Sequence, residues 1–357
     1  MTQSNPWSYF WEKGAKASFL DDSSRLPAYQ MRKFWFERMD ENDVKQPIVD
    51  IGTGNGAVVQ WLNEYAKEKS KKLDVQGIDS AQLNPPNTEL KLQGDTPYES
   101  FQLPSNKKVG TFVSHYGLEY GDMAEGLKNL NAQLKRGGML IALVHSKESV
   151  IYKKSEAIYD LMPSVIKQLK KSVEPLQEAL LKHGPKNLPR SALQAQQILN
   201  QFVRKHERNP SFHAMNFVPA TKHLLNAAAE GKDAESRQVL NGYMDSLNAH
   251  KARTKTLLKA TEQLGDMDKT QKQFEAAGFK KVTVQQVQFP ESGVFGNCVI
   301  AFKWISLFIV QATFCGLVNT LCNKANKIRT KSLQAINFLL NFKQLLLKKR
   351  HNKNVPG

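Results

Sequence analysis

The chain has few cysteines, and they form no recognisable pattern. Its 357 residues include three, Cys298, Cys315 and Cys322, all within the last sixty positions. An odd number without framework spacing excludes a disulfide scaffold and indicates a reducing compartment, so we expect a cytoplasmic protein. Residues 1–14 lack the basic segment followed by an apolar one that marks a secretory signal, and we expect none.

The low numbers of glycine and proline exclude several classes of protein. Glycine (21) and proline (15) are too few for a collagen-like or low-complexity chain, and 41% apolar with 23% charged residues is typical of a folded globular protein. The length predicts two to three domain-sized units. Four central histidines show no metal-ligand spacing, so we expect no metal site; they are His206, His213, His223 and His250.

Acidic residues are absent from 304–357, and charge is distributed very unevenly. The overall net charge of +17 would by itself indicate a polyanionic partner such as nucleic acid or an anionic membrane. However, residues 1–146 carry −1 and 266–303 carry +1, whereas 147–265 carry +8 and 304–357 carry +9. The excess positive charge therefore bears on where the protein is located and not on its reaction. Nucleic acid is not the favoured partner.

Residues 1–146 alternate short apolar runs with helical patterns. Predicted strands lie at 45–51, 73–79, 90–95, 108–114 and 139–145, the last after the turn 136–138. Residues 57–69 have apolar side chains at helical spacing. Strands separated by helical stretches predict βαβ units and a parallel sheet.

The predicted strand ends bring a glycine loop and several polar residues to one edge of the sheet, where such sheets bind ligands. The loop reads Gly52-Thr53-Gly54-Asn55-Gly56 and precedes a helix, whose N-terminus favours negative charge. A dinucleotide fingerprint is met only if Ala57 is accepted as its last glycine. Asp50, two residues before the loop, would repel a pyrophosphate and suits a cationic ligand.

Several segments resemble the class I S-adenosylmethionine-dependent methyltransferases. IVDIGTGNG, VQGIDSA, LQGDTPYE and VGTFVSHYGLEY resemble the first four motifs of that family, and RGGMLIALVHS, QFEAAGFKKVTVQQV and FGNCVIAFK resemble its later elements. The resemblance covers 45–146 and 270–303. It implies an α/β fold with a Rossmann-like, doubly wound, seven-stranded, mostly parallel sheet. It also implies an α-helical insertion before the last two strands. Residues 7–19 resemble an aromatic lead-in helix that lids the cofactor.

The resemblance assigns residues to the S-adenosylmethionine site. The backbone of Gly52, Gly54 and Gly56 would contact the methionine part of the cofactor, with Asp50 organising the loop and the amino group. Asp79, after the second strand, would bind the ribose hydroxyls, because a carboxylate accepts two hydrogen bonds.

The later motifs supply the remaining residues. Asp95 would accept a hydrogen bond from the adenine amino group, with Thr96 beside it, and Ser114 and His115 would line the site near the methyl group. Methyl transfer depends mainly on positioning, and a base is needed only if the acceptor loses a proton. His115 and Glu119 are the candidate catalytic residues.

These observations predict an S-adenosylmethionine-dependent methyltransferase that modifies an unidentified O or N acceptor, either a small molecule or a protein. The methyltransferase domain would comprise 1–146 and 266–303, and 147–265 would form a helical cap. The alternatives are an NAD(P)-dependent Rossmann oxidoreductase and a non-catalytic cofactor-binding scaffold. Nothing in the sequence indicates an oligomeric state.

The insertion and the tail leave several interpretations open. Residues 156–171, 192–205, 221–230 and 234–260 have amphipathic helical patterns, with breaks expected at prolines that include Pro163. The positive insertion would attract an acidic substrate or protein, or serve only as a solvated cap. The tail, 304–357, combines nineteen uncharged residues with a basic, apolar helix pattern. It would attach peripherally to a membrane, pack on the domain as a helix pair, or be a non-selected extension.

Overall fold

The computed structural model describes residues 6–15, 25–104, 107–290 and 292–303. The chain divides into two units, Met1–Trp304 and Ile305–Gly357, and all described residues belong to the first. The predictions for the tail, and for residues 16–19 of the lead-in helix, lie outside the described residues. Within the described part, no helix is long and apolar enough to cross a membrane.

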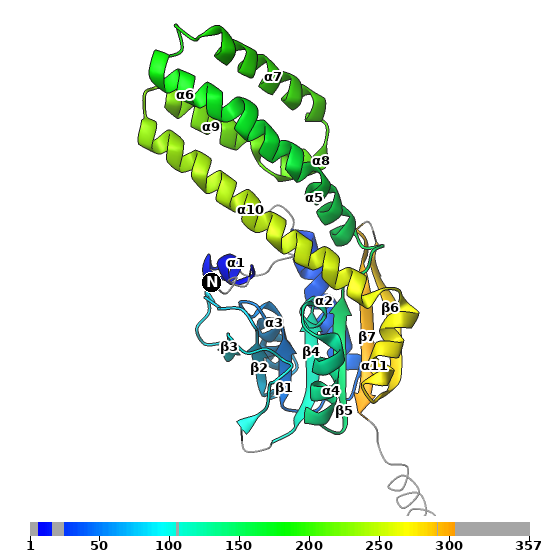
Figure 1. The fold of residues 1–357 in the computed structure, drawn as a ribbon. Coiled ribbons are helices and arrows are strands. Elements are labelled where there is room, and N and C mark those ends of the chain that lie inside the picture. Colours follow the sequence, from blue (N-terminus) through cyan, green and yellow to red (C-terminus); the bar gives the residue numbers. More distant parts are fainter. Residues whose placement is uncertain (1–5, 16–24, 105–106, 291, 304–357) are drawn as a thin grey trace, which may run out of the picture. The chain divides into compact units, whose positions relative to one another are not determined.

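A seven-stranded sheet forms the centre of this unit (Figure 1). Its strands follow the order β3-β2-β1-β4-β5-β7-β6, and all neighbours are parallel except β7, which is antiparallel to β5 and β6. This confirms the predicted Rossmann-like, mostly parallel sheet. The strands are β1 Ile48–Ile51, β2 Val75–Ile78, β3 Leu92–Gln93, β4 Val109–His115, β5 Leu134–Val144, β6 Phe279–Phe289 and β7 Gly293–Lys303.

Helices cover both faces of the sheet. Side chains of successive strand residues point to opposite faces, so Val49 packs in one apolar cluster and Ile48 in another. The cluster around Val49 includes residues of α4 (Met123–Gln133) and α11 (Met267–Ala276). The cluster around Ile48 includes residues of α2 (Arg25–Glu41) and α3 (Ala57–Glu68). Two short elements, α1 (Ser8–Glu12) and the 3₁₀ turn η2 (Leu118–Tyr120), lie beside the carboxyl ends of the strands.

Between β5 and β6 the chain forms a helical insertion with an apolar core of its own. Its longest helix, α10, has 32 residues and contacts α9, α5 and η2, so it connects the insertion to the carboxyl edge of the sheet. The insertion consists of α5 Val150–Gln168, the π-helical η3 Leu169–Val173, α6 Glu174–His183, α7 Arg190–His206, α8 Pro210–Ala214, α9 Phe217–Ala229 and α10 Asp233–Leu264.

The break expected at Pro163 is wrong, because this proline lies inside α5. Proline removes one backbone hydrogen bond from a helix interior. Met162 and Val165, on either side, are fully buried in the core of the insertion, and their burial offsets that loss. The turn expected at 136–138 is also wrong in part, since β5 begins at Leu134 and its pairing with β4 shifts register across these residues.

Candidate functional site

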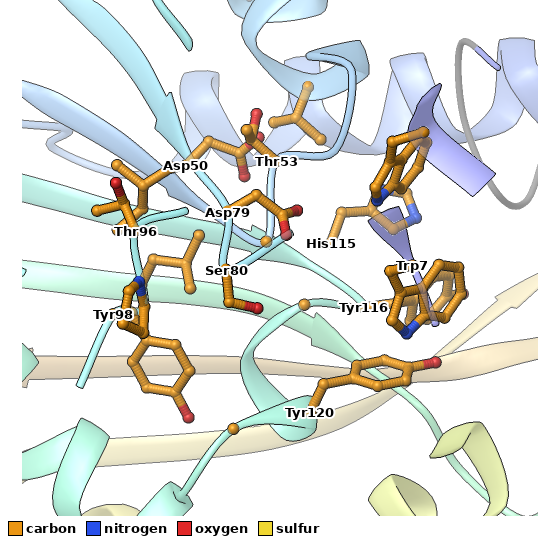
Figure 2. Close-up of a pocket in the computed structure, with 18 of the residues that line it drawn as sticks. Trp7, Asp50, Thr53, Asp79, Ser80, Thr96, Tyr98, His115, Tyr116 and Tyr120 are labelled. Atoms are coloured by element: carbon orange, nitrogen blue, oxygen red, sulfur yellow. The ribbon is translucent and has the colours of Figure 1, made fainter. Parts of the chain in front are cut away.

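A cavity of about 330 Å³ opens at the carboxyl ends of β1, β2 and β4. The strand order reverses between β1 and β4, and open α/β sheets bind their ligands at such a switch point. The volume lies within the range of small-molecule sites, roughly 300–1,000 Å³. In Figure 2, Asp79 lies near the middle of the view with Asp50 beside it, and aromatic residues that include Trp7, Tyr98 and Tyr120 lie below and to the right.

Asp50 presents a buried carboxylate to the cavity from the end of β1. The residue is 1% exposed, and the Thr53 side chain donates a hydrogen bond to its carboxylate, which opposes a rise in pKa. Burial raises the pKa of Asp50 to about 8. A buried carboxylate that no cation balances costs folding free energy. Asp50 is therefore suited to a positively charged ligand.

Asp79 directly follows β2, and its carboxylate organises the glycine loop. Oδ2 accepts a hydrogen bond from the backbone N of Gly54, and Oδ1 accepts one from the backbone N of Ala81, both at 2.8 Å. Burial raises the pKa of Asp79, and these two bonds oppose the rise. Each oxygen keeps a further lone pair for a ligand hydroxyl. Asp79 lines the cavity and is 8% exposed.

The three loop glycines are required by packing within the protein itself. All have positive φ, at 65° for Gly52, 52° for Gly54 and 90° for Gly56. A Cβ on Gly52 would meet the backbone of Gly117, and one on Gly54 would meet the indole of Trp11. Gly52 lines the cavity, whereas Gly54 and Gly56 are not among its lining residues. The cofactor contacts predicted for Gly54 and Gly56 stay predictions.

Helix α1 supplies an aromatic wall to the cavity. Trp7 and Trp11 both line it, and their rings stack with centroids 6.1 Å apart. The Asn55 side chain of the glycine loop donates to the backbone oxygens of Trp11, at 3.1 Å, and Ala15, at 2.8 Å. From the insertion, the Arg253 guanidinium lies over a third α1 ring, that of Phe10, 4.9 Å from its centroid. The glycine loop and α10 thus both hold α1.

The end of β4 brings two predicted site residues together, with different surroundings. Ser114 is fully buried; its hydroxyl donates to the backbone oxygen of Ile51 and accepts from the backbone N of Leu118, both at 2.9 Å. It is not among the lining residues. His115 lines the cavity, and its Nδ1 accepts a hydrogen bond from Trp35 Nε1 at 2.9 Å. Burial lowers the pKa of His115 to about 3, so it is neutral near pH 7.

Glu119, the other candidate catalytic residue, lines a different cavity. It is 1% exposed, and its Oε1 accepts a hydrogen bond from the backbone N of His145 at 2.7 Å. Burial raises the pKa of Glu119 to about 7. The cavity that it lines, about 800 Å³, lies between η2, α4, α10 and α11.

Asp95 and Thr96, predicted to bind adenine together, point to different places. Thr96 lines the main cavity, and its backbone N donates to the backbone oxygen of Asp79 at 2.7 Å. Asp95 has a positive φ of 50° and lines a separate depression near Leu83 and Pro85. The adenine contact of Asp95 stays a prediction, and Thr96 is the member of the pair that faces the cavity.

Tyr120 and His145 lie within the family-like motifs, but neither was predicted to be a site residue. The Tyr120 hydroxyl lies 3.0 Å from His145 Nε2, and the His145 ring stacks on Tyr116 at 4.4 Å with an interplanar angle of 1°. Tyr120 and His145 are 25 positions apart in the chain and meet because β4 and β5 pair. Only the strand pairing, which spacing along the chain does not reveal, brings them together. Among the described residues, no group of three or more His, Cys, Asp or Glu could hold a metal ion.

No family model and no curated protein matches the chain. Several solved structures that resemble it are described as methyltransferases. One is a possible histamine N-methyltransferase from Thermotoga maritima, with 14% identity over 83% of this chain and 99% of that chain, and a TM-score of 0.35. Another is the CMeT domain of the citrinin polyketide synthase, with 10% identity over 78% of this chain and 52% of that chain, and a TM-score of 0.37.

An amino pentose methyltransferase from Micromonospora echinaspora has 17% identity over 33% of this chain and 49% of that chain, with a TM-score of 0.24. The chain thus spans about half the length of this protein and of the polyketide synthase chain. With TM-scores below 0.5, these similarities decide neither the activity nor the ligand.

Proposed function

We propose that the protein is an S-adenosylmethionine-dependent methyltransferase that modifies an O or N acceptor on a small molecule or a protein. The observation that carries this proposal is the buried carboxyl group of Asp50, which no cation in the described part of the chain balances and which shares the switch-point cavity with Asp79. Residues 1–146 and 266–303 would form the methyltransferase domain, with 147–265 as its cap.

The residues of the cavity fit this cofactor. S-adenosylmethionine carries an ammonium group and a sulfonium. Such cations would stabilise the ionised form of Asp50, whose buried carboxyl group is otherwise mostly protonated near pH 7. Asp79 has lone pairs for the ribose hydroxyls, and Thr96 and Tyr98 line the same cavity. When bound, the cofactor supplies a methyl group that is already activated.

The protein's own residues would bind, orient and exclude water. Trp7 and Trp11 cover the cavity with apolar rings and limit the access of water. His115 is neutral near pH 7, and the hydrogen bond from Trp35 holds its ring in place. Positioning of the acceptor would supply most of the acceleration.

A nicotinamide dinucleotide fits the same cavity less well. Its pyrophosphate would lie at the glycine loop, where Asp50 and Asp79 place two carboxyl groups. The loop N–H of Gly54, which could donate to a phosphate, already donates to Asp79. The electrostatics thus support a cationic ligand over a dianionic one.

Calorimetry with S-adenosylhomocysteine and with NAD tests the proposal. We expect the full chain to bind S-adenosylhomocysteine and not NAD, and no binding of the former would refute the methyltransferase assignment. The Asp50→Asn variant should weaken binding at least about tenfold, the loss of one charged hydrogen bond. The matched control is Asp74→Asn, an exposed acid before β2 that pairs with Lys91.

Assaying transfer of a labelled methyl group across lysate fractions then separates an enzyme from a non-catalytic scaffold. A labelled fraction identifies the acceptor class. Cofactor binding without labelling of any fraction supports the scaffold alternative.

A further inference from the structure

The second cavity adjoins the first at η2. Its walls come from η2 and α4 of the sheet domain, from α10 of the insertion and from α11. Figure 1 shows α10 running from the insertion to the turn before α11. Tyr120 and Gly121 line both cavities. Tyr120 and Gly121 therefore belong to the wall that the two cavities share.

Two residues that line the second cavity each carry a buried acceptor atom without a hydrogen-bond partner in the described part of the chain. The atoms are Oε2 of Glu119 and Oε1 of Gln273, from two different elements. The remaining polar atom of each side chain is engaged. Glu119 Oε1 accepts from the backbone N of His145, and Gln273 Nε2 donates to the backbone oxygen of Gln263 at 3.0 Å. These bonds fix the side chains with one acceptor unsatisfied on each.

Unsatisfied buried acceptors select a ligand that donates hydrogen bonds. Each is costly to leave without a donor, because burial removes its hydrogen bonds to water. Burial of Glu119 also raises its pKa to about 7, so its charged form lacks the stabilisation that a cation would give. Lys128 and Lys259 also line the cavity, but both are exposed, where water and salt screen their charge.

We propose that the second cavity binds a small amine, with the Glu119 carboxylate as its counter-ion and the Gln273 carbonyl as a second acceptor for its N–H groups. The identification of this amine as the methyl acceptor rests on the proposed function; its binding does not. A nucleophilic amine must be neutral. One proton therefore passes from the ammonium to the Glu119 carboxylate, which leaves an uncharged amine and a carboxylic acid.

Matched pairs of ligands test this proposal on the full chain. The probes are benzylamine against benzyl alcohol, and tyramine against its alcohol analogue tyrosol, with binding measured by saturation-transfer NMR. We expect at least one amine to bind at least tenfold more tightly than its alcohol. Glu119→Gln should remove that preference, whereas the control Glu125→Gln, an exposed acid on α4, should keep it. Equal binding of amine and alcohol in both pairs overturns the proposal, as does an unchanged preference in Glu119→Gln.

Glutamine at 119 can still accept from His145, so this variant should fold. Should it fail to fold, Ala276→Trp replaces it, because Ala276 is an exposed residue of α11 that lines the cavity. Amine binding that persists with this bulky ring in the cavity also overturns the proposal. Calorimetry with S-adenosylhomocysteine on the same samples separates the two inferences. Amine binding without S-adenosylhomocysteine binding would refute the methyltransferase function alone, and the converse would refute the amine site alone.

Discussion

The hydroxyl of Tyr120 and Nε2 of His145 lie 3.0 Å apart at the wall between the two cavities. Both groups are neutral near pH 7, because burial lowers the pKa of His145 to about 3 and raises that of Tyr120 well above its ordinary value. Stacking on Tyr116 fixes the His145 ring, and an edge-to-face contact at 5.4 Å places Trp7 on Tyr120. The hydrogen bond therefore persists over the whole physiological pH range.

Removal of the Tyr120 hydroxyl should affect catalysis more than cofactor binding. In Tyr120→Phe the ring that contacts Trp7 remains, so we expect the dissociation constant of S-adenosylhomocysteine to change less than about twofold. The rate of methyl transfer should fall about tenfold, the effect of one hydrogen bond. Calorimetry and the labelled-methyl assay measure the two quantities. A larger loss of binding than of rate would show that Tyr120 serves the cofactor instead.

His145 should contribute no inflection to the pH–rate profile between pH 5 and 8, because its pKa of about 3 keeps it neutral there. His145→Phe retains a ring on Tyr116 but lacks Nε2, and we expect it to lower the rate as Tyr120→Phe does. An inflection near pH 6 that disappears in His145→Phe would contradict the neutral pair.

Asp50 should make the free protein less stable as the pH rises. Its pKa is about 8 in the folded state and about 4 in an unfolded chain, so the folded state binds more protons between these values. Stability is then greatest below about pH 4 and declines up to about pH 8. Each pKa unit corresponds to about 1.4 kcal/mol.

Asp50→Asn should remove this contribution. Urea unfolding of both proteins from pH 4 to 8 should give a difference in unfolding free energy that grows with pH in favour of the variant. Other groups, such as Glu119, titrate in both proteins, so their contributions cancel in the difference. A difference in unfolding free energy that does not change with pH would show that ionisation of Asp50 destabilises the folded state little. The variant therefore gains stability while it loses cofactor affinity.

Asp79 and Asp95 should differ in their importance for binding. Asparagine at 79 would point an amide N–H at the backbone N of either Gly54 or Ala81, so we expect at least about a tenfold loss of S-adenosylhomocysteine affinity. Asparagine at 95 tolerates the positive φ of that residue and should change affinity less than about twofold. Isothermal titration of both variants measures the contrast. Equal losses of affinity in the two variants would support the predicted contact between Asp95 and the adenine.

Local patterns were sufficient to predict most of the sheet. Alternating apolar runs and the glycine loop place β1, β2 and β4 within a few residues, and the carboxyl ends of parallel strands must share an edge. Asp50 and Asp79 were therefore predictable as neighbours. The role of Gly54 was predictable only in part: a glycine is needed, but its immediate reason is the Trp11 ring, which comes from 43 positions away.

Features that depend on side-chain direction and on long-range packing could not be predicted. Thr96 and Asp95 are adjacent in sequence, yet Thr96 lines the main cavity, whereas Asp95, with its positive φ, lines a separate depression. Pro163 remains in α5 because its neighbours are buried in the core of the insertion, which no local helix signal reports. Glu119 lines the second cavity because α10 and α11 close it from distant parts of the chain.

Arg253 should link the insertion to the retention of the cofactor. Its guanidinium lies over the ring of Phe10 in α1, whose tryptophans line the first cavity. A cation–π contact is worth about 0.5–1 kcal/mol at such partly exposed sites. Arg253→Ala should therefore raise the dissociation rate of S-adenosylhomocysteine about two- to fivefold, as measured by stopped-flow tryptophan fluorescence.

The matched control is Lys255→Ala, which removes an exposed cation from the same helix and should leave that rate unchanged. Because α10 contacts η2 as well as α1, an effect of Arg253 on binding could also reach the cofactor through Tyr120. The Arg253→Ala/Tyr120→Phe double variant resolves this: additive changes in the dissociation rate indicate that Arg253 acts through α1 alone. Identical rates in Arg253→Ala and Lys255→Ala would show that α10 does not hold the aromatic wall.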